Sequence, residues 1–166
     1  GGKIPVGLAR AVVPAAPDAW IKVLAKYGTM SFGDVATSAM RYARDGFSIH
    51  PLLAENIDTH QDRYQSWPAS AEVFLPEGRP LKTGELVVQR DLGRSLQYMI
   101  DEEKAAAGKG RDAALEAARA SFYKGDIAKT ITDYHAANGG MLSMEDMAEY
   151  ASAFEAPVGR TYTGFG

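Results

Sequence analysis

Helix start and stop signals divide residues 121–150, SFYKGDIAKTITDYHAANGGMLSMEDMAEY, into short helical segments. Apolar side chains recur at helical spacing over 127–134, and the Asn-Gly-Gly run at 138–140 follows them. Glycine ends many helices because it adopts left-handed backbone angles at little cost. We therefore expect a helix that stops at this run, with Gly140 at a positive φ. Residues 121–150 are therefore predicted to fold as helices joined by tight turns.

Two pairs of polar residues have the spacing of a capping box, Ser31 with Asp34 and Ser143 with Asp146. In this motif the two residues exchange hydrogen bonds between side chain and backbone, which fixes the start of a helix locally. We expect a helix after Ser31 that ends near Asp45, and a short helix after Ser143.

Apolar periodicity predicts four further helices. They span about 17–27, 51–67 and 89–107, and a stretch through 115–122 that stops at Gly125. Each is bounded by a residue that suits a helix end, such as proline at a first turn or glycine after a last one. The helical content is therefore high.

The remaining segments predict short β elements. Residues 71–88 contain prolines and glycines that break any long element, so we expect a folded loop with short strands and Trp67-Pro68 as the stop of the helix before it. The run 158–165 alternates β-branched and aromatic residues with small ones, as in a strand of a larger sheet. The sequence thus predicts a mainly α fold with short β segments.

Composition limits the class of protein and its partners. The chain of 166 residues is 46% apolar, which is enough for one core, and we expect residues 1–166 to form a single partial domain. Its 18 basic and 21 acidic residues are mixed along the chain, so we expect no nucleic-acid partner. No apolar run approaches the roughly 18 residues of a membrane-spanning helix, so we expect no membrane span. Gly1-Gly2 at the start and TYTGFG at the close suggest a piece of a larger protein.

A search for chemistry assigns no catalytic, cofactor-binding or metal-ligating residue. His50, His60 and His135 are never four residues apart, so no single helix offers two imidazoles to zinc. The glycine pattern GKGRDA at 108–113 lacks the buried strand that a dinucleotide-binding turn requires, and is interpreted as a linker. No serine lies in a hydrolase motif, and the chain has no cysteine.

Three segments in fixed order carry a resemblance to a known family. They are YGTMSFGDVATSAMRYARDGFSIHPLLAENI, FLPEGRPLKTGELVVQRDLGRSL and FYKGDIAKTITDYHAANGGMLSMEDMAEY. Together they resemble the large-subunit region of γ-glutamyltranspeptidases, and the likeness runs from about Val12 to Phe165. No single segment is diagnostic, but the ordered set is specific.

The resemblance implies an N-terminal-nucleophile hydrolase with an αββα sandwich. Such an enzyme is made as one precursor that cuts itself and exposes a threonine at the start of a small catalytic subunit. That threonine attacks a γ-glutamyl amide such as glutathione, with its own α-amine as base. The acyl group then passes to water, an amino acid or a peptide. The implied partners are the rest of the large subunit, the small subunit and a small-molecule γ-glutamyl substrate. No cofactor is implied, and bacterial members are usually periplasmic or secreted.

The family's catalytic residues have no counterpart in this chain. The arginine that holds the glutamyl carboxylate lies upstream of the matched region and the threonine lies downstream, so Thr161 and Thr163 are not assigned as nucleophiles. We expect the chain alone to be inactive, with an exposed apolar face that could drive self-association.

Two departures leave other functions open. Val13-Pro14-Ala15 stands where members have valine-proline-glycine, and the segment 101–120 is longer than expected. Both could reshape a substrate entrance. The alternatives are a related acylase, a capsule-type transpeptidase, or a non-enzymatic helical interaction module.

Overall fold

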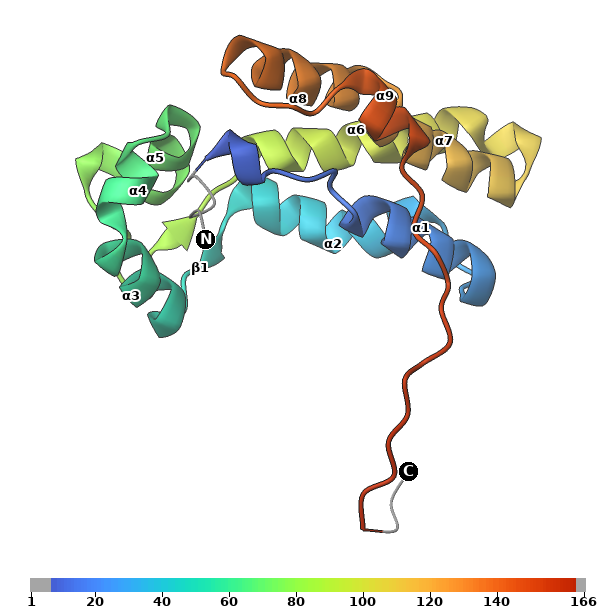
Figure 1. Ribbon diagram of the computed structural model, residues 1–166, viewed down its shortest axis with the longest axis horizontal. Helices are drawn as coiled ribbons and strands as arrows, with labels where there is room; N and C mark the ends of the chain where they lie inside the picture. Colours follow the sequence, from blue (N-terminus) through green and yellow to red (C-terminus); the bar gives the residue numbers. More distant parts are fainter. Residues whose placement is uncertain (1–6, 164–166) are drawn as a thin grey trace, which may run out of the picture.

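The computed structural model describes residues 7–163, which are mainly helical (Figure 1). At the centre, α6 (Arg90–Ala106) packs between α2 (Phe32–Asp45) and α7 (Arg111–Tyr123). α1 (Ala16–Tyr27) and α8 (Asp126–Ala137) also pack against α7, and α1 shares an apolar core with α2, α6 and α7. These helices form the body of the molecule, as the sequence predicts.

A smaller lobe lies at one end of this body, on the left in Figure 1. It contains α3 (Pro51–Thr59), α4 (Gln61–Gln65) and α5 (Pro68–Phe74). Two short strands, β1 (Phe47–Ser48) and β2 (Leu86–Val87), join the lobe to the body as an antiparallel pair in which Phe47 lies opposite Val87 and Ser48 opposite Leu86. The shorter elements are α9 (Met144–Glu149) and the 3₁₀ turns Leu8–Arg10, Pro76–Gly78 and Ala107–Lys109.

Each part has its own apolar core. The body core lies between α1, α2, α6 and α7 and is built on Ile21, Phe32, Met99, Ile100 and Leu115. The lobe has a separate core that contains Ile49, Ile57, Leu75, Leu81 and Val87. A third cluster, Tyr123, Ala128 and Met147, fastens α8 and α9 to α7.

The two predicted capping boxes are confirmed. The Ser31 hydroxyl accepts a hydrogen bond from the Asp34 amide at 3.0 Å, and the Asp34 carboxylate accepts one from the Ser31 amide at 3.1 Å. Ser143 and Asp146 exchange the same pair of bonds at 3.1 and 2.9 Å. These bonds satisfy amides that have no partner inside the helix.

The predicted helix over 51–67 is wrong in detail. It breaks at His60, where φ is −114° and ψ is 26°, so α3 and α4 are separate helices. Pro68 does not stop a helix but lies in the first turn of α5. Proline suits that place because a first-turn amide has no partner within the helix. The predicted loop at 71–88 accordingly begins only after Phe74.

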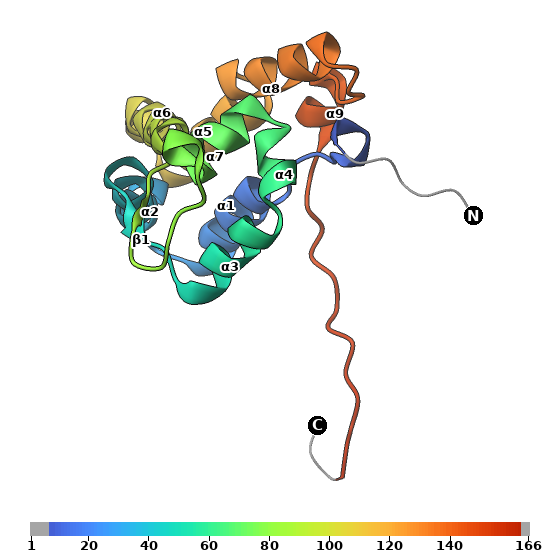
Figure 2. The same ribbon diagram turned by 90° about the vertical axis from the view of Figure 1, so that its left-hand side faces the viewer.

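The predicted strand over 158–165 does not form in residues 158–161, and Tyr162 makes a single bridge. Residues 164 and 165 lie outside the described part of the chain. Figures 1 and 2 show the segment from 151 to 163, here called the C-terminal arm, extending away from the helices. β-Prone residues pair only where a neighbouring strand offers its backbone groups, so an extended arm is what remains.

Within residues 7–163, none of the helices combines the length and apolar character needed to span a membrane.

Candidate functional site

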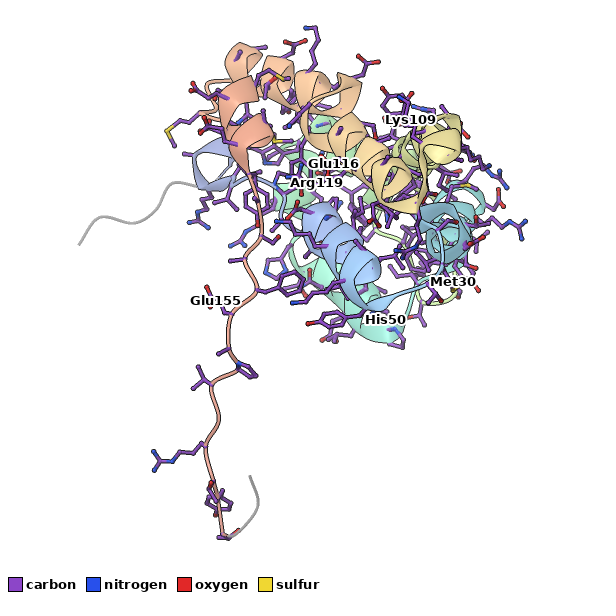
Figure 3. The ribbon with its side chains drawn as sticks, turned by 90° about the vertical axis from the view of Figure 1, so that its right-hand side faces the viewer. Met30, His50, Lys109, Glu116, Arg119 and Glu155 are labelled. Atoms are coloured by element: carbon purple, nitrogen blue, oxygen red, sulfur yellow. The ribbon has the colours of Figure 1, made fainter. Side chains whose placement is uncertain are left out.

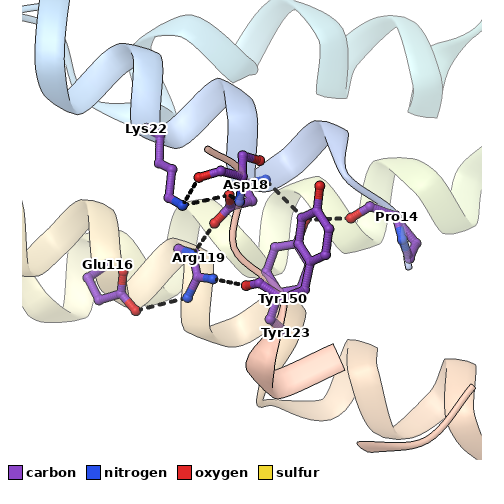
Figure 4. Close-up of polar contacts among 8 residues, drawn as sticks. Pro14, Asp18, Lys22, Glu116, Arg119, Tyr123 and Tyr150 are labelled. Carbon is purple, nitrogen blue, oxygen red and sulfur yellow. Dashed lines mark hydrogen bonds and ion pairs between the residues drawn. The ribbon is translucent and has the colours of Figure 1, made fainter. Parts of the chain in front are cut away.

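The most strongly built polar cluster lies where α1, α7 and the segment after α9 meet (Figure 4). We call it the Asp18 cluster, and it contains Asp18, Lys22, Arg119, Tyr123 and Tyr150. Asp18 is completely buried and Arg119 nearly so, whereas charged side chains rarely leave water without a partner. The contacts around the carboxylate therefore decide what the cluster can do.

Both oxygens of the Asp18 carboxylate are occupied. Oδ1 accepts a hydrogen bond from Arg119 Nε. Oδ2 accepts one from the Ser152 amide at 2.7 Å and lies 3.2 Å from Lys22 Nζ, one helical turn further along α1. Charge-assisted bonds of this kind are among the strong ones. The buried negative charge is thus balanced by two cations and a backbone amide.

These contacts lower the pKa of Asp18. Burial by itself raises the pKa, but hydrogen bonds from Ser152, Arg119 and Lys22 outweigh it and bring the pKa from 3.8 to about 2. The carboxylate is therefore ionised at neutral pH. An ionised group whose oxygens are already bound is suited to holding structure together and poorly suited to acting as a proton donor.

Tyr123 joins the same cluster through its hydroxyl. The hydroxyl accepts a hydrogen bond from the Asp18 amide at 3.1 Å and donates one to the carbonyl of Pro14 at 2.5 Å. The Tyr123 ring is fully buried and stacks on Tyr150, with centroids 5.8 Å apart. Burial raises the pKa of Tyr123, so the hydroxyl keeps its proton. Tyr123 thus fixes the chain that enters α1.

A second buried carboxylate lies at the start of α2. Glu103 of α6 accepts hydrogen bonds from the amides of Phe32 and Gly33 at 2.6 and 2.7 Å. Beside it, Arg111 donates to the carbonyls of Leu24 and Gly28 at the end of α1. An anion at a helix start and a cation at a helix end both complement the helix dipole. This cluster also serves packing.

The structure does not bring the three histidines together. His50 caps α3 by accepting a hydrogen bond from the Leu53 amide, and His60 contacts the carbonyl of Asn56. His135 is buried at the end of α8, where its Nδ1 accepts from the Leu142 amide. Among residues 7–163, no three His, Cys, Asp or Glu side chains are grouped so as to hold a metal ion. In the view of Figure 3, α1 lies between Arg119 and His50.

The glycine pattern at 108–113 forms part of the 3₁₀ turn Ala107–Lys109 and the first turn of α7. The element before it is the helix α6 rather than a strand. Residues 108–110 therefore connect α6 to α7, as the interpretation as a linker expects, whereas residues 111–113 already belong to α7.

Sequence reasoning missed Asp18 and Arg119, and it did not predict that Glu103 caps the start of α2. Asp18 lies in the first turn of α1, where an acidic residue is expected for dipole reasons alone. Its partner Arg119 lies 101 residues away, and a helical pattern does not indicate which distant charges will meet. The one local signal that these residues are buried is that each lies on a helix face whose other side chains are mainly apolar.

Comparisons with known proteins give a consistent family. A family model described as gamma-glutamyltranspeptidase matches residues 2–166. The chain is 34% identical over 144 residues to a glutathione hydrolase proenzyme of Bacillus subtilis. The aligned region covers 87% of this chain and 22% of that protein. The chain is also 32% identical over 160 residues to an acylase ACY 1 proenzyme of Pseudomonas sp. strain SE83. Here the aligned region covers 96% of this chain and 26% of that protein.

A solved structure supports the same relationship. The cephalosporin acylase from Bacillus halodurans superposes with a TM-score of 0.78 and 27% identity, over 96% of this chain and 28% of that one. The chain thus spans about a quarter of the length of the relatives it matches. The family model covers the chain almost from end to end and the arrangement of helices agrees, so the chain belongs to the γ-glutamyltranspeptidase family.

Proposed function

We propose that this chain is the helical part of an enzyme that cleaves γ-glutamyl amides such as glutathione and transfers the γ-glutamyl group to water, an amino acid or a peptide. The observation that carries the proposal is the family match over residues 2–166, together with 34% identity to a glutathione hydrolase proenzyme. That relative is a proenzyme, which supports a precursor that is processed into subunits. The chain is then one domain-sized portion of the large subunit, residues 1–166.

In this proposal the catalytic residues lie outside the chain. Three buried polar side chains have partners in the fold itself: Asp18 binds Arg119, Glu103 binds the start of α2, and His135 binds the Leu142 amide. An N-terminal threonine elsewhere in the protein supplies the nucleophile and its α-amine the base. The chain alone is inactive.

The proposed partner of this chain is the rest of the same protein. An apolar surface on α1, α2 and α6, here called the α1–α2 face, consists of Trp20, Val23, Tyr27, Val35 and Leu92. Trp20 is 56% exposed and Tyr27 is 69% exposed. Beside them lies a hollow of about 360 Å³ with almost wholly apolar walls. Exposed apolar patches of this kind mark contact surfaces.

Mass spectrometry of the longer protein that contains this chain tests the proposal. Self-cleavage into two subunits, with threonine at the new N-terminus, is expected. The processed protein should release p-nitroaniline from γ-glutamyl-p-nitroanilide, and the 166-residue chain by itself should not. A precursor that stays uncut and inactive would overturn the enzymatic proposal in favour of a binding or structural role.

A second candidate function is that of an acylase. It is favoured by 32% identity to an acylase proenzyme over 96% of this chain and by the superposition on a cephalosporin acylase. The two candidates differ in the acyl group, because a γ-glutamyl group carries an α-amine and a simple dicarboxylic acyl group does not. The rates on γ-glutamyl and glutaryl p-nitroanilide therefore separate them. Cleavage of the glutaryl compound alone would favour the acylase.

A further inference from the structure

The start of the C-terminal arm is held by three side chains from two helices. The carbonyl of Tyr150 accepts a hydrogen bond from Arg119 Nη2 at 2.6 Å. The amide of Ser152 donates to Asp18 Oδ2 at 2.7 Å, and its carbonyl accepts from Lys22 Nζ at 2.6 Å. Every one of these bonds involves a charged group, so each is stronger than an ordinary backbone bond.

The contacts thin out beyond Ser152. The Phe154 ring lies edge-on to Tyr27, with centroids 6.1 Å apart, and Lys26 Nζ lies 4.0 Å from the centroid of the Phe154 ring. From Ala153 to Thr163 every described residue is exposed, and Figure 3 shows Glu155 on the arm well away from the helices. The strong restraints on the arm are therefore gathered at residues 150–152.

A single guanidinium links the three elements. Arg119 of α7 donates through Nε to Asp18 of α1 and through Nη2 to the carbonyl of Tyr150. Asp18 in turn binds the Ser152 amide, so the carboxylate cannot move without disturbing both the α1–α7 contact and the arm (Figure 4). Fixing a backbone residue costs conformational entropy, and these bonds offset that cost for the residues they hold.

We propose that Asp18, Lys22 and Arg119 form a latch that fixes the direction in which the C-terminal arm leaves the helical body. The latch is a conformational device: it acts on the arm through the backbone of Tyr150 and Ser152. When it is broken, the arm swings freely from the end of α9 while the core of α2, α6 and α7 stays folded.

Hydrogen exchange on the 166-residue chain tests the latch. In Asp18→Asn the Ser152 amide loses its charged acceptor, and its exchange should be roughly tenfold faster than in the unaltered chain. Amides of Met99 and Ile100, in the core of α6, should exchange at unchanged rates. The matched control is Asp45→Asn, which makes the same chemical change in an exposed ion pair with Arg44 and should leave Ser152 unaffected.

A second variant keeps the test decisive if Asp18→Asn fails to fold. Lys22→Met removes the bond to the Ser152 carbonyl and the ion pair with Asp18, and it leaves the Asp18–Arg119 pair in place. Far-UV circular dichroism should show native helix content, and chymotrypsin should cut after Tyr150 several times faster than in the unaltered chain. If a folded Lys22→Met chain, or a folded Asp18→Asn chain, kept the unaltered exchange rate at Ser152 and the unaltered cleavage rate after Tyr150, the latch would be overturned.

Discussion

Glu103 caps the helix that begins at Phe32, although 71 residues separate them in the chain. The Phe32 amide donates to one carboxylate oxygen at 2.6 Å, and the Gly33 amide donates to the other at 2.7 Å. The capping box of Ser31 and Asp34 satisfies the next amide of the same turn. The start of α2 is therefore fixed twice, once by its own residues and once by α6.

Glu103→Gln should destabilise the fold by about 2 kcal/mol, because a buried charge-assisted pair of bonds is replaced by one neutral acceptor and one misplaced donor. The glutamine amide nitrogen would face a backbone amide, and two donors repel. Glu103 is 4% exposed, so water cannot take over the lost bond. Urea unfolding followed by circular dichroism measures the change.

Glu102→Gln is the matched control for that variant. Glu102 is the neighbouring residue on α6 and is more accessible than Glu103, so its neutralisation should change the free energy of unfolding by less than about 0.5 kcal/mol. Equal effects from the two variants would show that net charge, rather than the cap, is responsible.

The parts of the fold that could be predicted from the sequence are those set by neighbouring residues. The Ser31 and Ser143 capping boxes formed as expected because both partners lie within one helical turn. The prediction at Pro68 is wrong because proline is common both after the end of a helix and in the first turn of the next one. Only the packing of α5 decides which of these two places Pro68 takes. The strand predicted at 158–165 depends on a partner strand that the local sequence does not specify.

The polar clusters could not be predicted for the same reason. Asp18 and Arg119 each look like ordinary charged residues on amphipathic helices, and only the packing of α1 on α7 buries them together. The family resemblance, in contrast, was visible in three ordered segments and is confirmed by the family match. The absence of assigned catalytic residues stays a prediction, which the activity of the isolated chain will test.

The Asp18 carboxylate should make the stability of the chain depend on pH below about 4. Its pKa is about 2 in the folded chain, against an ordinary value of 3.8, so the unfolded state binds a proton first as the pH falls. The stabilisation, about 2 kcal/mol, is complete above pH 4 and is lost between about pH 4 and pH 2.

The difference in unfolding free energy between the unaltered chain and Asp18→Asn, measured against pH, isolates the contribution of the Asp18 carboxylate. Asp34, Asp45 and Asp146 also have lowered pKa values, caused first by side-chain hydrogen bonds from Ser31, Arg44 and Ser143, and both chains share them. The gap in unfolding free energy should be widest near neutral pH and close as pH 2 is approached. A gap that stayed constant with pH would contradict an ionised, paired Asp18.

The α1–α2 face should make the isolated chain bind hydrophobic dyes and self-associate. Replacing Trp20 and Val23 by glutamine removes two large apolar groups that are 56% and 51% exposed, so dye fluorescence and the sedimentation coefficient should both fall. Leu52→Gln is the control, since Leu52 is 71% exposed on α3, outside this face. A monomeric unaltered chain that binds no dye would count against the face as a contact surface.

Substitutions at Gly139 and Gly140 should both destabilise the end of α8, but for different reasons. The positive φ lies at Gly139, with a value of 72°, rather than at Gly140 as the sequence suggested. Gly139→Ala should cost about 1 kcal/mol, because its Cβ meets no other atom within 4 Å and only the backbone angle is unfavourable. A Cβ at Gly140 would instead overlap the His135 ring, reaching 2.7 Å from Cγ.

Gly140→Ala should therefore cost more, about 2 kcal/mol, because the buried ring has to move and overpacking is unfavourable. A double-mutant cycle with His135→Ala separates this steric clash from an effect of the backbone angle. Removing the ring removes the clash, so the cost of Gly140→Ala should shrink in the His135→Ala background, whereas the cost of Gly139→Ala should not. Melting temperatures of the single and double variants measure both cycles. If the effects of Gly140→Ala and His135→Ala were as additive as those of Gly139→Ala and His135→Ala, contact with the His135 ring would not be the cause of the larger cost at Gly140.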